Sequence, residues 1–166
     1  MLKQLPDGLI LRSLSENIAS DVERLPDFYA SINAADDTDD IKEGVRVWTR
    51  DLMHGHATVT LDDIFVVVDP AKDDLLVSAT LLIPQTWRYE DVVIPVGRPE
   101  LVATHPDYRN RRLVRALFDA LHERSAALGH NLQVITGIAH FYRQFGYTMS
   151  LDRHGVHFLT AYVAGV

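Results

Sequence analysis

The chain has 166 residues, an apolar fraction of 47% and a formal net charge of −7 at pH 7. These values predict one globular domain spanning residues 1–166, and the acidic balance disfavours a general nucleic-acid binder. Because cysteine is absent, disulfides, thiolate metal sites and a cysteine nucleophile are excluded. With neither a secretory signal pattern nor an apolar run of the ~20 residues that a membrane helix needs, we expect a cytoplasmic protein without a membrane partner.

The first third of the chain predicts one strand followed by two helices. Residues 8–14 (GLILRSL) alternate as a strand does, and apolar residues recur at helical steps over 17–33. Pro26 lies inside that helical stripe, so we expect it to divide or bend the helix. Because carboxylates favour the positive end of a helix dipole, the acidic run 36–40 predicts the start of a second helix, which should end near Gly55.

The middle of the chain predicts three extended segments. The β-branched run 63–69 is typical of a buried strand, and a turn separates it from a second strand over 75–83, so the two should form a hairpin. The third segment, 92–105, contains two prolines, which favour an irregular or edge strand. Between the last two segments, 85–91 (QTWRYED) could form a flap over a cleft.

The remaining residues predict a long helix over 109–128 that ends at Gly129, followed by shorter elements. These are a strand, a short helix stopped by Gly146, and two final strands, over residues 132–136, 139–145, 147–151 and 156–163. Strands and helices in this order predict a mixed α/β domain with a central sheet. Trp48 is expected in the core of that domain. No histidine spacing matches a zinc site, so no metal is expected.

Four arginines surround the expected start of the long helix: Arg109, Arg111, Arg112 and Arg115. The amino end of a helix has unpaired N–H groups and partial positive charge, and a guanidinium can hold two phosphate oxygens. Residues 1–100 carry a net charge of −10 and residues 101–166 a net charge of +3, so the positive charge is local. A pocket for one compact anion, a solvated basic helix face and a nucleic-acid patch are the alternatives.

A second motif is HFYRQFGY, over residues 140–147. It places the phenol of Tyr142 on a short helix, close to a turn that enters a strand. The hydroxyl could donate a proton to a leaving group in a cleft. Alternatively, Tyr142 is an amphipathic residue that packs at a junction between helix and sheet.

The two motifs together, HPDYRNRRLVRAL and FYRQFGY, resemble the GNAT superfamily of acetyl-CoA-dependent N-acetyltransferases. The likeness is best over residues 100–151, and the amino-acid sequence of the two motifs looks most like the first domain of Eis-type acetyltransferases. It implies a central, mostly antiparallel sheet of about six to seven strands with about four helices. It also implies acetyl-CoA as the acyl donor and no metal.

The resemblance implies a role for each matching residue. Val102, Ala103 and Thr104 would pair with the amides of the donor's pantetheine arm, as an extended ligand pairs with a strand edge. Arg109 and the loop that follows it would hold the pyrophosphate; the loop residues are Asn110, Arg111, Arg112, Leu113, Val114 and Arg115. Tyr142 would protonate the departing thiolate. Glu100 would accept the amine proton, or it is an exposed carboxylate at a strand edge.

Two functions follow from this sequence. The first is transfer of acetyl by direct attack of a primary amine, carried by a small molecule or a peptide, and the acidic residues 1–100 favour a cationic acceptor. The second is a catalytically silent GNAT-fold protein that binds a CoA-like ligand or a protein partner. It is motivated by Arg112 and Val114, which fill positions where the family pattern has small residues. The chain could also form a homo-oligomer.

Overall fold

A computed structural model describes residues 2–16, 19–138 and 140–150 of the chain. The chain divides into two compact units, Met1–Ile135 and Thr136–Val166. The first unit contains a sheet and three α-helices. Within the part of the chain that the structure describes, no helix is both long enough and apolar enough to span a membrane.

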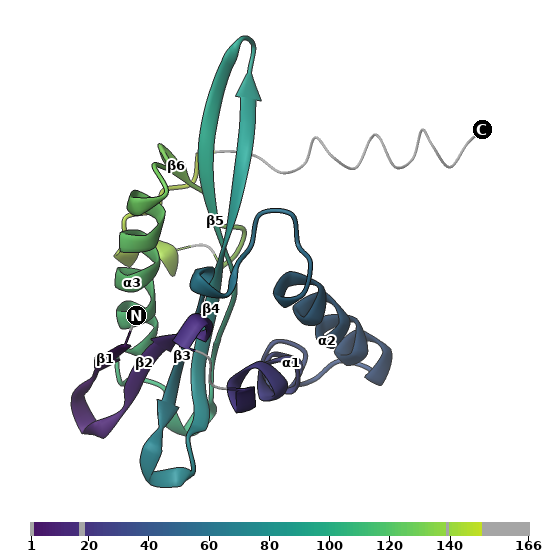
Figure 1. Ribbon diagram of the computed structural model, residues 1–166, viewed down its shortest axis with the longest axis vertical. Coiled ribbons are helices and arrows are strands. Elements are labelled where there is room, and N and C mark those ends of the chain that lie inside the picture. The colour runs from purple at the N-terminus through teal and green to yellow at the C-terminus, as the bar shows by residue number, and fades with distance from the viewer. Residues whose placement is uncertain (1, 17–18, 139, 151–166) are drawn as a thin grey trace. The chain divides into compact units, whose positions relative to one another are not determined.

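Six strands form one sheet in the first unit, and they lie side by side in the order of the sequence (Figure 1). Each of the first four strands is antiparallel to the next, whereas the sixth is parallel to the fifth. The strands are β1 Leu2–Gln4, β2 Ile10–Ser13, β3 Ile64–Asp69, β4 Leu75–Tyr89, β5 Val92–Thr104 and β6 Leu132–Gln133. The predicted mixed α/β class with a mostly antiparallel sheet is therefore confirmed.

The helices cover both faces of this sheet (Figure 1). Helices α1 (Ala19–Asn33) and α2 (Asp39–Met53) lie on one side, and α3 (Leu113–Ala127) lies on the other. Alternate residues of β3 and β4 enter different cores, as the two-residue period of a strand requires. The core under α1 and α2 includes Leu25, Tyr29, Val66, Leu81 and Leu101. The core under α3 includes Val67, Val77, Leu82, Leu117 and Leu121.

The first half of the chain differs from the sequence predictions in three places. Helix α1 is not divided at Pro26, which lies buried inside it; the buried Leu25 and Tyr29 beside it pack into the core and offset the lost backbone hydrogen bond. Strand β1 was missed because its three residues are all exposed and show no alternation. Trp48 is not a core residue, since 39% of its surface is exposed on α2.

The predicted hairpin of β3 and β4 is confirmed, and β4 forms a second, longer hairpin with β5 that the sequence did not predict. Strand β4 continues past residue 83 to Tyr89, so that QTWRYED forms its end and the turn into β5 rather than a separate flap. The two strands project beyond the rest of the sheet (Figure 1). Strand β5 lies between β4 and β6, but it pairs with β6 only at Val96 and Gly97, and its register with β4 shifts between Glu100 and Ala103, so the predicted irregular or edge character is confirmed. The carbonyls of Pro95 and Gly97 accept hydrogen bonds from Asn131 and Val134, so by alternation the backbone groups of Pro95 and Pro99 face away from β4 and the missing N–H groups cost that ladder nothing.

In the second unit, the predicted short helix is a 3₁₀ helix, η6 (Tyr142–Phe145). Gly146 ends it with φ at 93°, in the left-handed region that suits glycine, as predicted. The segment 147–150 is not a strand, contrary to prediction. Leu151 and the predicted strand 156–163 lie outside the described residues.

A buried ion pair joins the sheet to α1. Arg12 on β2 donates two hydrogen bonds to Asp21, at 2.7 Å from Nε and 2.9 Å from Nη2, and a third to Asp74 at 3.2 Å. The side chains of Arg12 and Asp21 are only 4% and 1% exposed. Removing one partner would leave the other charge buried with too few partners, which is costly.

We therefore expect Asp21→Asn to lower the free energy of unfolding by about 3 kcal/mol, measured by urea denaturation. The matched control is Asp27→Asn, because Asp27 is paired with Arg46 at 2.6 Å but is 72% exposed. It should change stability by less than about 0.5 kcal/mol. Equal losses in the two variants would contradict the importance of the buried pair.

Candidate functional site

One edge of β5 is only partly paired. Strand β6 pairs with it at Val96 and Gly97, and the N–H of Val134, just past β6, donates to the carbonyl of Gly97 at 3.0 Å. From Arg98 to Thr104, no strand among the described residues pairs with β5 on that side. We call this stretch, residues 98–104, the free edge.

The register with β4 decides which backbone groups face the free edge. The N–H of His105 donates to the carbonyl of Val77 at 2.8 Å, so the backbone groups of His105 and Ala103 point toward β4. Because these directions alternate along a strand, the groups of Val102 and Thr104 point the other way. An extended ligand with amide groups could pair with them as an added strand.

A β-bulge interrupts β5 beside this edge. Ala103 lies opposite Ala79 and Glu100 opposite Leu81, so three steps along β5 match two along β4. The extra residue is Leu101, whose φ is +50°. A bulge sharpens the local twist and re-aims side chains, and bulges are frequent beside active sites.

Two buried hydroxyls of β4 hold the bulge in place. Ser78 Oγ donates to the carbonyl of Ala103 at 2.8 Å, and Thr80 Oγ1 donates to the carbonyl of Glu100 at 3.1 Å. Both residues are fully buried. Neither residue was predicted as part of the site, although a serine and a threonine inside the apolar run LLVSATLLI indicated buried hydroxyls that need hydrogen-bond partners.

The bulge also determines where Glu100 points. Its cross-strand partner Leu81 belongs to the core under α1 and α2, so the Glu100 side chain lies on that face of the sheet. The carboxylate forms an ion pair with Arg98 and accepts a hydrogen bond from the N–H of Leu101 at 3.4 Å. With 15% of its side chain exposed, Glu100 is held in place but keeps access to solvent.

The loop between β5 and α3 is anchored through Tyr108. This residue is 2% exposed, and its hydroxyl donates to Asp69 at 2.5 Å. The guanidinium of Arg111 stacks 4.7 Å from the centre of the Tyr108 ring, and the ammonium of Lys72 lies 5.0 Å from it. The loop therefore has a fixed conformation, and Arg111 is already engaged with an aromatic face.

The predicted start of the long helix was wrong. Helix α3 begins at Leu113 rather than at Arg109, with Arg112 as its N-cap residue. Arg112 has φ 60° and ψ 21°, and Asn110 has φ 64°, so both are left-handed. The first intrahelical hydrogen bond runs from the N–H of Ala116 to the carbonyl of Arg112 at 3.1 Å, and the Arg112 side chain does not cap the helix. The N–H groups of Leu113 and Val114 thus have no acceptor within the helix.

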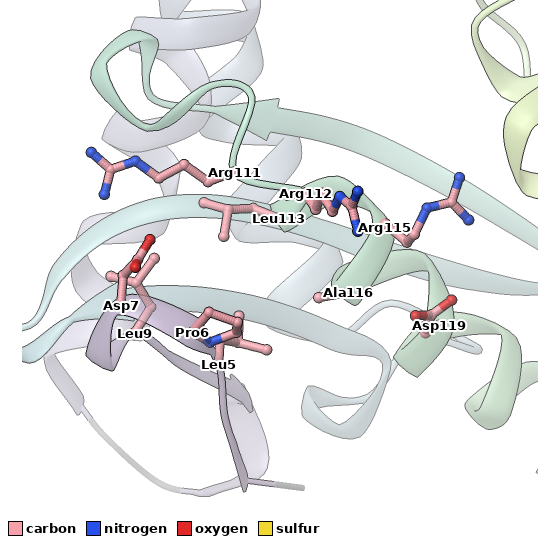
Figure 2. Close-up of a pocket in the computed structure, with 10 residues that line it drawn as sticks. All are labelled: Leu5, Pro6, Asp7, Leu9, Arg111, Arg112, Leu113, Arg115, Ala116 and Asp119. Carbon is pink, nitrogen blue, oxygen red and sulfur yellow. The ribbon is translucent and has the colours of Figure 1, made fainter.

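A surface hollow of about 210 Å³ lies between the start of α3 and residues 5–9 (Figure 2). Its lining combines apolar side chains with three arginines and two aspartates: Leu5, Pro6, Asp7, Leu9, Arg111, Arg112, Leu113, Arg115, Ala116 and Asp119. Figure 2 shows that the guanidinium of Arg111 points away from those of Arg112 and Arg115. The three arginines therefore do not converge on one point.

Tyr142 lies in the second unit, at the first position of η6. Its half-buried ring makes edge contacts with Phe141 and Tyr147, at centroid distances of 5.1 and 6.2 Å. A side chain at Gly137 would collide with it, because a Cβ there would lie 2.6 Å from the Tyr142 ring. The phenol is thus fixed in orientation. Burial raises the pKa of the neighbouring Tyr147, so that hydroxyl stays protonated.

The structure thus brings most of the predicted site residues together in the first unit. The free edge and the α3 start are joined by one short loop, and they contain Glu100, Val102, Ala103, Thr104, Arg109, Asn110, Arg111, Arg112, Leu113, Val114 and Arg115. Tyr142 is the one predicted site residue of the second unit. Among the described residues, no group of three or more histidine, aspartate or glutamate side chains could hold a metal ion.

Residues 28–150 match the family model of the acetyltransferase (GNAT) domain, which is most of the chain. The chain belongs to the GNAT acetyltransferase family. In this GNAT domain, the free edge, the bulge and the α3 start lie within the matched region. No curated protein matches the sequence significantly.

Solved structures share the fold at low sequence identity. Glucosamine-6-phosphate N-acetyltransferase from Arabidopsis thaliana is 12% identical with a TM-score of 0.63, over 87% of this chain and 95% of that one. A predicted acetyltransferase from Clostridium acetobutylicum, solved with acetyl-CoA, is 10% identical with a TM-score of 0.64, over 90% and 99%. AAC(6')-Iy, solved with the bisubstrate analogue CoA-S-monomethyl-acetylneamine, is 11% identical with a TM-score of 0.61, over 87% and 93%.

We expect Thr80→Val to loosen the bulge, because it removes the donor to the Glu100 carbonyl without a large change in volume. The free energy of unfolding should fall by about 1–2 kcal/mol. Hydrogen exchange should quicken at amides of residues 98–104 more than at those of β2 and β3. Uniform acceleration across the sheet would show that Thr80 acts on global stability alone.

Proposed function

We propose that this GNAT domain transfers an acetyl group from acetyl-CoA to a primary amine by direct attack. The observation that carries the proposal is the free edge of β5, which leads by one short loop to the open start of α3. Free backbone groups at the edge suit an extended chain of amides, and the α3 start suits a diphosphate. These are the two parts of coenzyme A that such a site has to hold.

The α3 start would hold the diphosphate. The N–H groups of Leu113 and Val114 are available there, and the helix dipole adds positive charge. Arg109, Arg112 and Arg115 add guanidinium groups around them. Arg111 would contribute less, because its guanidinium stacks on Tyr108.

Acetyl-CoA, when bound, supplies the thioester carbonyl that the amine attacks. Backbone groups of Val102 and Thr104 would hold the pantetheine arm, and an N–H of the free edge would stabilise the charge that develops on the carbonyl oxygen. Glu100 would take the proton that the attacking nitrogen loses, directly or through water, with its ion pair to Arg98 holding the carboxylate in place. Tyr142 would give its proton to the departing sulfur. Each proton then has a donor and an acceptor without a covalent enzyme intermediate.

The acceptor we propose is a cationic amine, on a small molecule or a peptide. The net charge of −10 over residues 1–100 supports this choice, since that part of the chain supplies both helices on the Glu100 face of the sheet. The amino-acid sequence of the two motifs favours the first domain of Eis-type acetyltransferases as the subtype.

A catalytically silent relative is the second candidate. The observation that favours it is the arginine at the left-handed position 112, where the family pattern has glycine and the cofactor approaches closely. Such a protein would bind a CoA-like ligand weakly or instead bind a protein partner.

Two measurements on Tyr142→Phe distinguish these functions. Calorimetry should show that the wild-type protein and the variant bind CoA with equal affinity, because the phenol serves the leaving group rather than the diphosphate. With acetyl-CoA and a panel of polyamines, aminoglycosides and lysine peptides, kcat should fall by about 100-fold. Tyr29→Phe is the control, since it also removes a phenol, from a fully buried residue of α1. CoA binding without turnover of any amine would favour the silent relative.

Arg112→Gly tests the α3 start. Glycine adopts the left-handed conformation without the cost of about 1 kcal/mol that a side chain incurs, and it opens the backbone to phosphate. We expect thermal stability to change by less than a few degrees and CoA to bind several-fold more tightly in calorimetry. Weaker binding would mean that the attraction of the Arg112 guanidinium for the CoA phosphates outweighs the steric obstruction by its side chain. Asn110→Gly, at the other left-handed position, is the matched variant.

A further inference from the structure

Gly97, the last residue of β5 that pairs with β6, lies against two polar side chains. A Cβ at this position would be 2.7 Å from Nδ1 of His130 and 2.8 Å from Oγ of Ser125. The two side chains are themselves hydrogen bonded, at 3.0 Å. Ser125 is 1% exposed and His130 is half-buried, and together they occupy the space that a side chain at position 97 would need.

The same pair connects the end of α3 to the start of β6. Ser125 lies in the last turn of α3, and the N–H of His130 donates to its carbonyl at 3.1 Å. Gly129, with φ at 72°, reverses the chain between them. The next residues bond directly to β5: the N–H of Asn131 donates to the carbonyl of Pro95 at 2.9 Å, and that of Val134 to Gly97 at 3.0 Å.

The chemistry of the pair suits a fixed contact. Burial lowers the pKa of His130, against the opposing effect of Asp63, so the ring is neutral at pH 7 and its Nδ1 can accept the Ser125 hydroxyl proton. Arg124, the residue before Ser125, donates to the buried Asp63 at 2.8 Å and holds this end of the helix. A buried hydroxyl without its partner would be costly, so the pair favours one geometry.

From these contacts we infer that Ser125 and His130 are positioning residues, which fix the point where β6 stops pairing with β5. They thereby set the length of the free edge that is open to the pantetheine arm of the acyl donor. The inference rests on the proposed function. In this inference the C-terminal end of α3 affects binding of the donor's pantetheine arm, whereas the N-terminal end of α3 binds the phosphates.

The test compares CoA with adenosine 3′,5′-bisphosphate, which has the 3′-phosphate and the first phosphate of the 5′-diphosphate but no pantetheine arm. Ser125→Ala and His130→Ala should each weaken CoA binding about fivefold in calorimetry, the effect of one lost hydrogen bond. Binding of the bisphosphate should stay within twofold of wild type. His130→Gln, which keeps an acceptor, should restore most of the CoA affinity. Thr49→Val is the control, because it removes a buried hydroxyl from α2, where Thr49 bonds to Val45.

Hydrogen exchange supplies a measurement that needs no ligand. In Ser125→Ala and His130→Ala, the amides of Asn131 and Val134 should lose protection relative to those of β3, and in Thr49→Val they should not. Unchanged protection at both amides, or equal loss of affinity for CoA and the bisphosphate, would overturn the positioning role. A wild-type protein that binds neither ligand would instead overturn the proposed function and this inference with it.

Discussion

The site depends on one strand that has to be paired along one edge and open along the other. Buried N–H and carbonyl groups are nearly always hydrogen bonded, so a strand inside a sheet normally has no backbone left for a ligand. Strand β5 escapes this constraint in two ways. Its pairing with β6 ends at Gly97, and a bulge at Leu101 turns the backbone locally beside the long ladder with β4. The free edge between these two points is the part of the sheet that can accept an extended ligand.

The start of α3 shows a second compromise, between backbone shape and side-chain chemistry. A left-handed residue is needed to turn the loop into the helix, and glycine would adopt that conformation without strain. Here Arg112 adopts it, at a cost of about 1 kcal/mol. The arginine adds charge at the place where an anion would bind, so the chain exchanges close approach of the backbone for electrostatic attraction. Anchoring of the loop through Tyr108 and Asp69 gives the stability that this conformation requires.

Periodicity in the sequence predicted the elements that pack against one another, and it failed where tertiary contacts override local preference. The stripe over 17–33 and the β-branched run 63–69 gave α1 and β3 because their spacing is dictated by burial. The start of α3 was misplaced because arginine is a good helix former. The chain there instead has left-handed residues at Asn110 and Arg112, next to Tyr108, which is held by Asp69 of another strand, and local sequence does not show that contact. The bulge at Leu101 was equally invisible, since it depends on hydroxyls of another strand. The two motifs located the candidate site, but the free edge became apparent only from the register of three strands.

Buried polar side chains around β5 indicate that its backbone path is closely specified. Ser78 and Thr80 donate to its carbonyls from β4, and Ser125 meets it at Gly97 from α3. A core that served stability alone would have apolar residues at these positions, because a buried hydroxyl contributes little net stability and is costly whenever its partner shifts. Hydrogen bonds from these hydroxyls do, however, favour one backbone arrangement of the strand over arrangements with a shifted register. Their concentration along β5 therefore indicates that the path of this strand, more than the tightness of the core around it, is what these residues specify.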